Sequence, residues 1–302
     1  MNRLDVMKKY LSVPAMLLPF AMVLSPSAIA AITPAPYVVP AVVKDSQDMQ
    51  IPDRVHLDVK SMLGARIHAN TYTRLLETVD VDRLLEGYRK RPGCMTWDGE
   101  HIGKWIHAAS LAWANSGDEK LRAKIASAVT ELIKCQEADG YLGTYLSNEQ
   151  IAVAENQQPK STTPQPKFIK RWTEWDVWSH KYNLLGLLTW AQLTGDQSAM
   201  NSCRKMGDLL CNTFGNEPGK RDFMKQGPFE GQVTVLEPMI MLYRMTGEPR
   251  YRDFCQYLID CNAKKPKPLV QTLLEQKRVD KVYAVHAYTM LSFLDGLLEW
   301  YR

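Results

Sequence analysis

Tryptophan, tyrosine, histidine and carboxylate side chains gather at four places in the sequence, each about one helix length before a predicted turn. The first two places are residues 97–105 and 172–183. The third and fourth are smaller and include Glu237 and His286. Sugars present apolar C–H faces that stack on aromatic rings, and hydroxyl groups that bond to carboxylates and imidazoles. Such residues around one cavity would therefore suit a carbohydrate ligand.

Each of these residues also has an ordinary structural interpretation, which the sequence leaves open. Tryptophan is usually mostly buried, and Glu100 or Asp176 could simply cap the N-terminus of a helix. Tyr141 lies in a loop that could face either a ligand or the core. His286 opens a predicted helix and is as compatible with a structural role as with a sugar contact. His107 falls on an apolar helix face, so we expect it in the core.

The elements that position these residues are predicted to be helical hairpins. Past residue 53, apolar residues recur at helical spacing. The sequence reads Ser-Gly-Asp at 116–118, Thr-Gly-Asp at 194–196 and Thr-Gly-Glu at 246–248. Glycine suits a left-handed helix C-cap, and the acidic residue after it can cap the next helix. We therefore predict three hairpins and the start of a fourth near residue 283.

The spacing of these turns favours a closed ring over a regular solenoid. The turn glycines lie 78 and then 52 residues apart, which is too long and uneven for 34-residue tetratricopeptide repeats. We expect an all-α fold, an (α/α)6 toroid of helical hairpins whose inner helices line a central cavity, incomplete at the C-terminus. A ring without its last hairpins would expose core surface. The chain is then either a gene fragment or needs a partner that covers this edge.

The N-terminal residues predict export. Residues 1–30 have a basic start, an apolar stretch at 11–24 and small residues that end at Ala30, the layout of a cleavable signal peptide. The apolar stretch is shorter than the ~20 residues that span a bilayer. We expect an extended segment at 31–54, a periplasmic or secreted protein, and no membrane contact after cleavage. The net charge of +4 is dispersed, which argues against nucleic acid as a partner.

Three motifs make the sequence resemble a known enzyme family. They are Gly-Glu-His-Ile-Gly-Lys-Trp-Ile-His-Ala at 99–108, Gln-Glu-Ala-Asp-Gly-Tyr-Leu-Gly-Thr-Tyr at 136–145, and Trp-Asp-Val-Trp-Ser-His-Lys-Tyr-Asn-Leu-Leu-Gly-Leu at 175–187. Together they resemble glycoside hydrolase family 127, the β-L-arabinofuranosidase-like enzymes. The resemblance makes residues 55–302 a partial α/α-toroid glycosidase catalytic domain. It implies an (α/α)6 barrel that acts on terminal arabinofuranose or related sugars with retention of configuration.

The resemblance also implies a cysteine nucleophile held by zinc and a glutamic acid that acts as acid and base. In the family these groups lie after the stretch that is matched here. No catalytic residue and no metal ligand can therefore be assigned, and zinc is expected only in the complete family enzyme. The six cysteines show no Cys-x-x-Cys spacing. The candidate sugar contacts are Trp97, Glu100, His101, Tyr141, Trp175, Tyr182, Glu237 and His286.

The expected function is that of a glycoside hydrolase for terminal arabinofuranose-like sugars of plant or microbial glycans, in a truncated copy that lacks the nucleophile. Two alternatives remain open. One is a non-catalytic, glycan-binding helical scaffold. The other is a different α/α-toroid carbohydrate enzyme with direct carboxylate acid/base chemistry, in which Lys104 and Lys181 would neutralise an acidic sugar.

Overall fold

The structure is a computed structural model that describes residues 57–151, 175–225, 233–282 and 286–302. Every described residue belongs to one compact unit. The predicted signal peptide, the predicted segment 31–54 and Trp172 of the second cluster lie outside the described residues. None of the described helices is long and apolar enough to cross a membrane.

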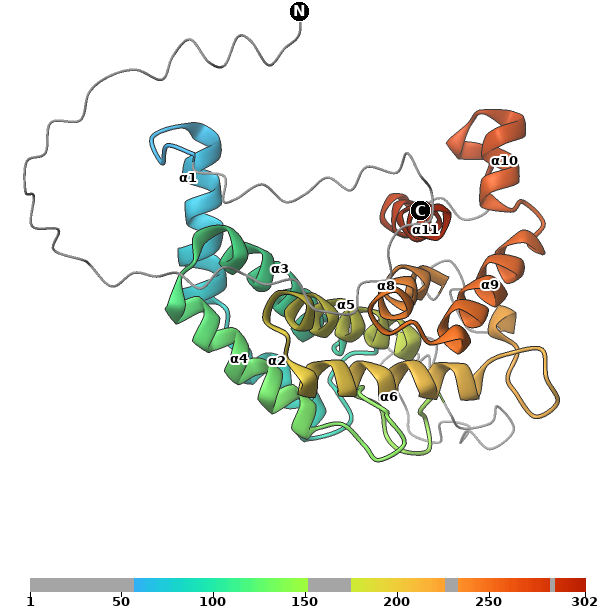
Figure 1. Cartoon of the computed structure of the whole chain (residues 1–302), viewed down its shortest axis with the longest axis horizontal. Helices are drawn as coiled ribbons and strands as arrows, with labels where there is room; N and C mark the ends of the chain where they lie inside the picture. The colour runs from blue at the N-terminus through green and yellow to red at the C-terminus, as the bar shows by residue number, and fades with distance from the viewer. Residues whose placement is uncertain (1–56, 152–174, 226–232, 283–285) are drawn as a thin grey trace, which may run out of the picture. The chain divides into compact units, whose positions relative to one another are not determined.

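Three helical hairpins follow one another along the chain (Figure 1). Each pairs two consecutive helices, in the order α3 (Glu100–Ser116) and α4 (Glu119–Lys134), α5 (Asp176–Thr194) and α6 (Gln197–Thr213), then α8 (Leu236–Thr246) and α9 (Pro249–Ala263). A further long helix, α11, spans Ala287–Tyr301. The shorter elements are α1 (Met62–His68), the π-helix η2 (Ala69–Thr78), α2 (Val81–Arg89), η5 (Phe223–Lys225), η6 (Val233–Val235), α10 (Leu269–Gln276) and η7 (Val279–Lys281).

The hairpin turns have the predicted chemistry. Gly117, Gly195 and Gly247 all adopt left-handed conformations, with φ of 68°, 75° and 70°. The Asp118 carboxylate accepts a hydrogen bond from the backbone N–H of Leu121 at 2.8 Å, so it caps α4. Asp196 caps α6 in the same way, whereas the side chain of Glu248 makes no capping bond to α9. The turn prediction is confirmed, with an acidic cap in two hairpins of the three.

The helices form an inner and an outer layer. In the inner layer α3 packs against α5, α5 against α8, and α8 against α11. In the outer layer α4 packs against α6, and α6 against α9. This alternation of inner and outer helices confirms the predicted all-α toroid architecture. The described residues contain three complete hairpins and one more inner helix, of the six hairpins that an (α/α)6 ring has.

Two glycines allow the first two inner helices to cross closely. A Cβ atom on Gly103 of α3 would lie 2.3 Å from the backbone carbonyl of Tyr182 on α5, and one on Gly186 would lie 2.5 Å from the carbonyl oxygen of Gly103. Neither position has room for a side chain. The crossing therefore places the N-terminal halves of α3 and α5 against each other, where the first two residue clusters lie.

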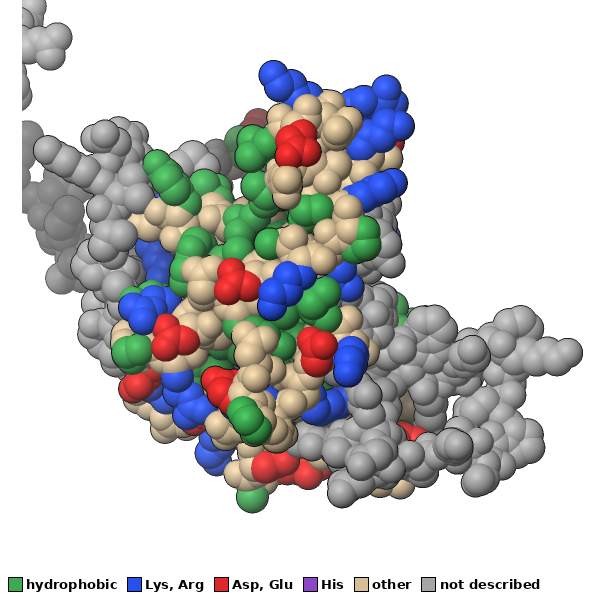
Figure 2. Space-filling view, turned by 90° about the vertical axis from the view of Figure 1, so that its right-hand side faces the viewer, with side chains coloured by type: hydrophobic (Ala, Val, Ile, Leu, Met, Phe, Trp, Pro, Cys, Tyr) green, Lys and Arg blue, Asp and Glu red, His purple; other side chains and the backbone are tan. Residues whose placement is uncertain are grey.

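The outer surface carries mixed side chains. Figure 2 shows the side of α9 and α10, where hydrophobic, basic and acidic groups are interspersed and Lys and Arg are most frequent at the end that carries α10. The six cysteines are all free thiols. The predicted burial in helices is confirmed for Cys203 and Cys255, while Cys135 lies half-buried at the end of α4.

Candidate carbohydrate site

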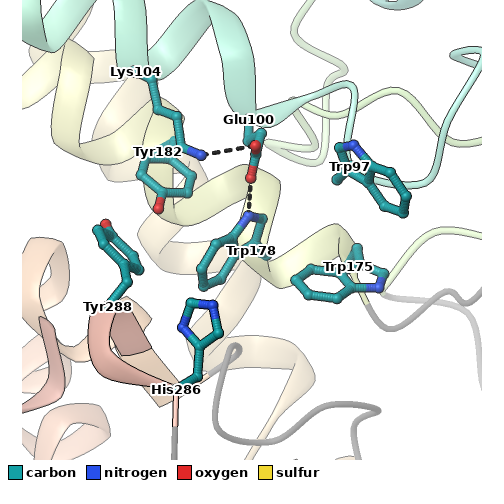
Figure 3. Close-up of a pocket in the computed structure, with 8 residues that line it drawn as sticks. All are labelled: Trp97, Glu100, Lys104, Trp175, Trp178, Tyr182, His286 and Tyr288. Atoms are coloured by element: carbon teal, nitrogen blue, oxygen red, sulfur yellow. Dashed lines mark hydrogen bonds and ion pairs between the residues drawn. The ribbon is translucent and has the colours of Figure 1, made fainter. Parts of the chain in front are cut away.

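A cavity of about 480 Å³ lies at the N-terminal ends of the inner helices α3, α5 and α11. We call it the aromatic cavity, because five of its eight lining residues are Trp or Tyr. Figure 3 shows all eight, which come from the segment before α3, from α3, from the start of α5 and from the start of α11. They are Trp97, Glu100, Lys104, Trp175, Trp178, Tyr182, His286 and Tyr288.

Four pairs of aromatic rings in this cavity contact each other edge to face, and Tyr182 and Tyr288 stack with centroids 6.3 Å apart. The centroids of Trp97 and Trp175 lie 6.3 Å apart with an interplanar angle of 73°, and those of Trp175 and Trp178 lie 5.4 Å apart at 86°. Trp178 makes the same kind of contact with Tyr182 and Tyr288, at 5.2 Å and 5.8 Å. Such T-shaped pairs are favourable. They fix the rings relative to one another and present an apolar wall to the cavity.

Glu100 supplies a carboxylate in front of this wall. Its Oε1 lies 2.7 Å from Nζ of Lys104 one helical turn later, and its Oε2 accepts a hydrogen bond from the indole N–H of Trp178 (Figure 3). Lys104 in turn sits 4.3 Å from the centroid of the Tyr182 ring. Two donors therefore hold the carboxylate of Glu100, and its remaining lone pairs are fixed acceptors for sugar hydroxyl groups.

A buried lysine joins three inner helices beside the cavity. Lys181 of α5 is fully buried, and its Nζ donates to Tyr288 Oη at 2.8 Å and to Ser292 Oγ at 2.6 Å on α11. Ser292 donates to the Glu237 carboxylate of α8 at 2.7 Å, and Lys181 Nζ lies 3.5 Å from the same oxygen. Burial lowers the pKa of Lys181 to about 8, with Glu237 acting in the opposite direction. The network holds Tyr288 in place.

A second cavity, of about 400 Å³, adjoins the first. It shares Lys104, Tyr182 and Tyr288 with the aromatic cavity, so these three residues form a common wall. We call it the acidic cavity, because it carries two carboxylates. It is lined by Lys104, His107, Tyr182, Leu185, Glu237, Tyr288, Leu291, Ser292 and Asp295.

The prediction that His107 belongs to the core is wrong. His107 is half-buried and lines the acidic cavity. Its Nδ1 lies 2.9 Å from Thr189 Oγ1, and that hydroxyl donates to the carbonyl of Leu185 at 2.8 Å. Because the Thr189 proton is used there, His107 Nδ1 carries a hydrogen and donates, which leaves Nε2 as an acceptor. Burial lowers the pKa of His107, which favours this neutral form.

Comparisons with known proteins identify the family of this chain. Residues 51–295 match the family model described as the catalytic domain of GH127 β-L-arabinofuranosidase. The chain belongs to glycoside hydrolase family 127. A "Non-reducing end beta-L-arabinofuranosidase" of Bifidobacterium longum subsp. longum is 28% identical over 173 residues, which are 57% of this chain and 24% of that protein. The family resemblance stated from the motifs is confirmed.

A solved family 127 structure shares the fold at low sequence identity. One GH127 β-arabinofuranosidase is 19% identical with a TM-score of 0.56, covering 79% of this chain and 38% of that one. The GH127 β-L-arabinofuranosidase Ara127N of Geobacillus stearothermophilus T6 is 18% identical with a TM-score of 0.46, covering 73% of this chain and 33% of its own. The chain thus spans about a quarter of the curated family 127 relative and little more than a third of the solved one.

The structure brings five of the eight candidate sugar contacts into one cavity. Trp97, Glu100, Trp175, Tyr182 and His286 all line the aromatic cavity. Glu237 lines only the acidic cavity. His101 is exposed and lines neither of these two cavities, and its Nδ1 lies 3.6 Å from Glu100 Oε1.

Tyr141 lies in the core and away from both cavities. Its side chain is fully buried, and its hydroxyl donates to Asp176 Oδ1 at 2.9 Å and accepts from the backbone N–H of Tyr145 at 3.0 Å. The alternative in which Tyr141 faces a ligand is therefore wrong, because all the bonding capacity of its hydroxyl is directed inward. Its role is to attach the loop after α4 to the start of α5.

The candidate contacts omitted several residues of the two cavities. Trp178 lies within the second sequence cluster at 172–183, Lys104 lies within the first at 97–105, and Tyr288 follows the candidate His286 by two residues. Helical spacing could have found Trp178 and Lys104, because they lie four residues from the candidates Tyr182 and Glu100 on the same helices. Asp295 had no signal beyond its place seven residues after Tyr288.

The described residues offer no zinc site. Across the described ranges, no group of three or more His, Cys, Asp and Glu side chains is placed to hold a metal ion. The ligands that family 127 chemistry implies do not fit the side chains of either cavity, where the only histidines are His107 and His286 and there is no cysteine.

Proposed function

We propose that this chain forms the sugar-binding wall of a family 127 glycoside hydrolase site, and that the aromatic cavity takes a terminal β-L-arabinofuranose residue. The observation that carries the proposal is the set of aromatic rings around the held carboxylate of Glu100 in one 480 Å³ cavity. The substrate class follows the name of the Bifidobacterium relative, a non-reducing end β-L-arabinofuranosidase.

In this proposal the aromatic residues and the polar groups have separate tasks. The half-buried Trp175 and the exposed Trp97 stack on the apolar faces of the sugar ring. Glu100 accepts hydrogen bonds from its hydroxyls, and His286 at the start of α11 adds a second polar contact. The described residues then bind and orient the sugar, and cleavage of the glycosidic bond belongs to groups outside them.

The charges support a neutral sugar over an acidic one. In the alternative enzyme class, Lys104 and Lys181 would neutralise a uronate. Lys181 is fully buried and already bonded to Tyr288 and Ser292, so a carboxylate in the cavity cannot reach it without displacing those bonds. Lys104 is paired with Glu100 at 2.7 Å. Neither lysine is therefore available to pair with the carboxylate of an acidic sugar.

The experiment is titration of the full purified chain with methyl β-L-arabinofuranoside, followed by tryptophan fluorescence and by calorimetry. Because the ligand would lie against Trp175, we expect a fluorescence change on binding and a loss of affinity of about 10-fold in Trp175→Ala, equivalent to about 1.4 kcal/mol. Tyr301→Ala is the matched control, because Tyr301 is 67% exposed on α11 and lines neither cavity. No binding by the unaltered chain, or equal binding by Trp175→Ala, refutes the proposal.

A parallel assay with an aryl β-L-arabinofuranoside, with and without added zinc, separates the two classes of function. Binding without turnover supports the non-catalytic glycan-binding alternative for this chain. Turnover shows that a catalytic nucleophile lies within the 302 residues, contrary to the expected truncation.

A further inference from the structure

The end of the molecule that carries α10 holds an excess of positive charge. Residues 264–281 contain six Lys and Arg side chains against two acidic ones, a net charge of +4 that equals the formal net charge of the whole chain. The remaining residues are neutral overall, so the excess positive charge is not dispersed but lies at this end. Figure 2 shows its Lys and Arg side chains gathered over α10.

A pocket of about 510 Å³ lies beside α10. It is lined by residues of the connection between α9 and α10, of α10 itself and of η7. We call it the basic pocket, because Lys265, Lys267 and Lys281 line it. The one carboxylate of its lining, that of Glu275, accepts a hydrogen bond from the side-chain amide of Gln271 at 2.8 Å. The basic pocket therefore has more positive than negative charge.

Two of the lysines at this end have no counter-ion within the described part of the chain. Asp280 is bonded through both carboxylate oxygens to Arg278, each at 2.8 Å, and lies 3.6 Å from Nζ of Lys281. Lys267 and Lys277 are exposed and form no salt bridge with any described residue. Like charges gathered on one surface repel each other and attract an anionic ligand.

A mostly buried hydroxyl in the basic pocket points to a ligand independently of the charges. Thr272 is 8% exposed and lines the pocket. Its hydroxyl makes no hydrogen bond with any residue that the structure describes, and neither does the side-chain amide of Gln276, which lines the same pocket. A buried hydroxyl without a partner costs free energy, which a ligand hydroxyl would recover. The pocket thus suits a ligand that has both negative charges and hydroxyl groups.

The arrangement of the lysines favours a long anion. Lys267 comes before α10 and Lys277 follows it, and an α-helix of eight residues is ~12 Å long. A ligand that contacts both lysines therefore needs charges that repeat along its length. Nucleic acids and membranes fit less well, because a duplex or a bilayer is too broad to enter the pocket and reach Thr272. No aromatic residue lines the pocket, so it also lacks the stacking surface used by single-stranded nucleic acids.

We propose that the basic pocket docks an acidic polysaccharide, a polymer whose uronic acid carboxylates repeat along the chain. Lys267, Lys277 and Lys281 pair with these carboxylates, while Thr272 and Gln276 bond to hydroxyl groups of the sugar rings. The site is separate from the aromatic cavity, and polymer binding does not depend on the function proposed for that cavity.

The basic pocket is close to the aromatic cavity along the chain. Lys281 lines the basic pocket, and His286, five residues later, lines the aromatic cavity. Five residues span at most ~18 Å when fully extended. Docking of a polymer in the basic pocket therefore brings the aromatic cavity close to the same polymer.

The test compares a charged polymer with its uncharged form. The full chain is titrated by calorimetry with polygalacturonate and with the same polymer after complete methyl esterification, which removes the charges and keeps the sugar rings. We expect polygalacturonate to bind and the ester not to bind. The binding should be lost at about 0.5 M salt, because exposed charges are then screened.

Two matched double variants locate the effect. Lys267→Gln with Lys277→Gln should weaken polygalacturonate binding by about 10-fold. Lys120→Gln with Lys205→Gln removes two exposed lysines of the outer helices α4 and α6, and the affinity should stay within about 2-fold. Both double variants lower the net charge equally, so the difference between them measures the contribution of the pocket. Thr272→Val removes the unbonded hydroxyl and should weaken binding by about 3-fold.

The other polyanions are outcomes of the same test. Vesicles of phosphatidylcholine and phosphatidylglycerol that bind more tightly than polygalacturonate, and bind less well to Leu274→Gln, assign the surface to a membrane. Leu274 makes this distinction because it is 71% exposed on α10 and does not line the basic pocket. Duplex DNA that binds as tightly as polygalacturonate shows selection for charge alone. Either result overturns the proposal.

The proposal also fails if the unaltered chain does not bind polygalacturonate at low salt, or if both double variants lose affinity equally. These results are distinguishable from a failure of the aromatic cavity, because Lys267→Gln with Lys277→Gln should leave the affinity for the uncharged methyl β-L-arabinofuranoside within about 2-fold.

Discussion

The two sides of helix α5 carry similar residues with opposite tasks. Asp176, His180 and Asn183 lie at positions i, i+4 and i+7 on one side of the helix and bond to protein groups. Trp178, Tyr182 and Leu185 lie at the same spacing on the other side and line the aromatic and acidic cavities. Both sets come from one motif. The comparison shows that the side of the helix on which a residue lies, and not its type, decides which polar groups are available to a ligand.

The polar side chains on the inward side of α5 bond to groups of the protein. Asp176 accepts hydrogen bonds from Tyr141 at 2.9 Å and from the backbone N–H of Ile151 at 3.1 Å. His180 accepts from the backbone N–H of Leu142 at 3.2 Å, and Asn183 donates to the carbonyl of the same residue at 2.9 Å. These bonds attach the segment after α4 to α5, so the inward side is structural.

The largest effect is expected where α3 crosses α5, because both sides of α5 depend on that crossing. Gly103→Ala places a Cβ atom 2.3 Å from the backbone of Tyr182, which cannot move aside as a side chain could. Alanine favours helix by up to ~1 kcal/mol over glycine, but we expect the clash to exceed that gain and to lower the free energy of unfolding by about 3 kcal/mol or more. Urea denaturation of the purified chain measures it.

Sugar binding should be lost with stability in Gly103→Ala, since the helices that carry Glu100 and Tyr182 would separate. An unchanged unfolding midpoint would show that the close crossing is not needed, and the division of α5 into two sides would lose its structural basis.

The second-largest effect is expected on the inward side of α5, in the pH dependence of the free energy of unfolding. Burial raises the pKa of Asp176 from 3.8 to about 7, so the folded chain binds this proton more tightly and stability from this group falls as pH rises from 4 to 7. Burial lowers the pKa of His180 from 6.5 to about 4, so stability from this group rises with pH over the same interval. The two contributions have opposite signs and offset each other in the unaltered chain.

Single variants should expose each contribution. Relative to the unaltered chain, Asp176→Asn should gain stability as pH rises from 4 to 6.5, and His180→Gln should lose stability as pH rises from 4 to 7. Asp176→Asn should also cost about 2 kcal/mol at neutral pH, because the amide has one acceptor oxygen for two donors, the Tyr141 hydroxyl and the Ile151 N–H. The free energy of unfolding at several pH values tests both. Parallel pH profiles for the two variants would contradict the opposed pKa shifts.

Most of the architecture could be predicted from the sequence because its signals are local. Gly117 and Gly195 mark turns by their own conformational freedom, and helical periodicity identifies α3, α5 and α8. The site was only partly predictable, because the direction that a helix face takes depends on its neighbours. Tyr141 has the same chemistry as Tyr182, yet it faces the core. His107 lies on an apolar face, and only the position of α11 shows that this face borders a cavity.

The smallest effect is expected at the ion pair between Lys104 and Glu100 on α3, which lines the aromatic cavity. Lys104 has 40% of its side chain exposed, so removing the pair in Lys104→Met should change the free energy of unfolding by less than about 1 kcal/mol. The Glu100 carboxylate keeps Trp178 as a donor but loses its second anchor, so we expect affinity for methyl β-L-arabinofuranoside to fall by about 3-fold. Lys134→Met removes the comparable pair with Glu131 on the outer helix α4 and should leave affinity unchanged. If Lys104→Met and Lys134→Met bind the sugar with equal affinity, the orientation of Glu100 does not contribute to recognition. The side of α5 that lines the cavities then acts through its aromatic rings alone.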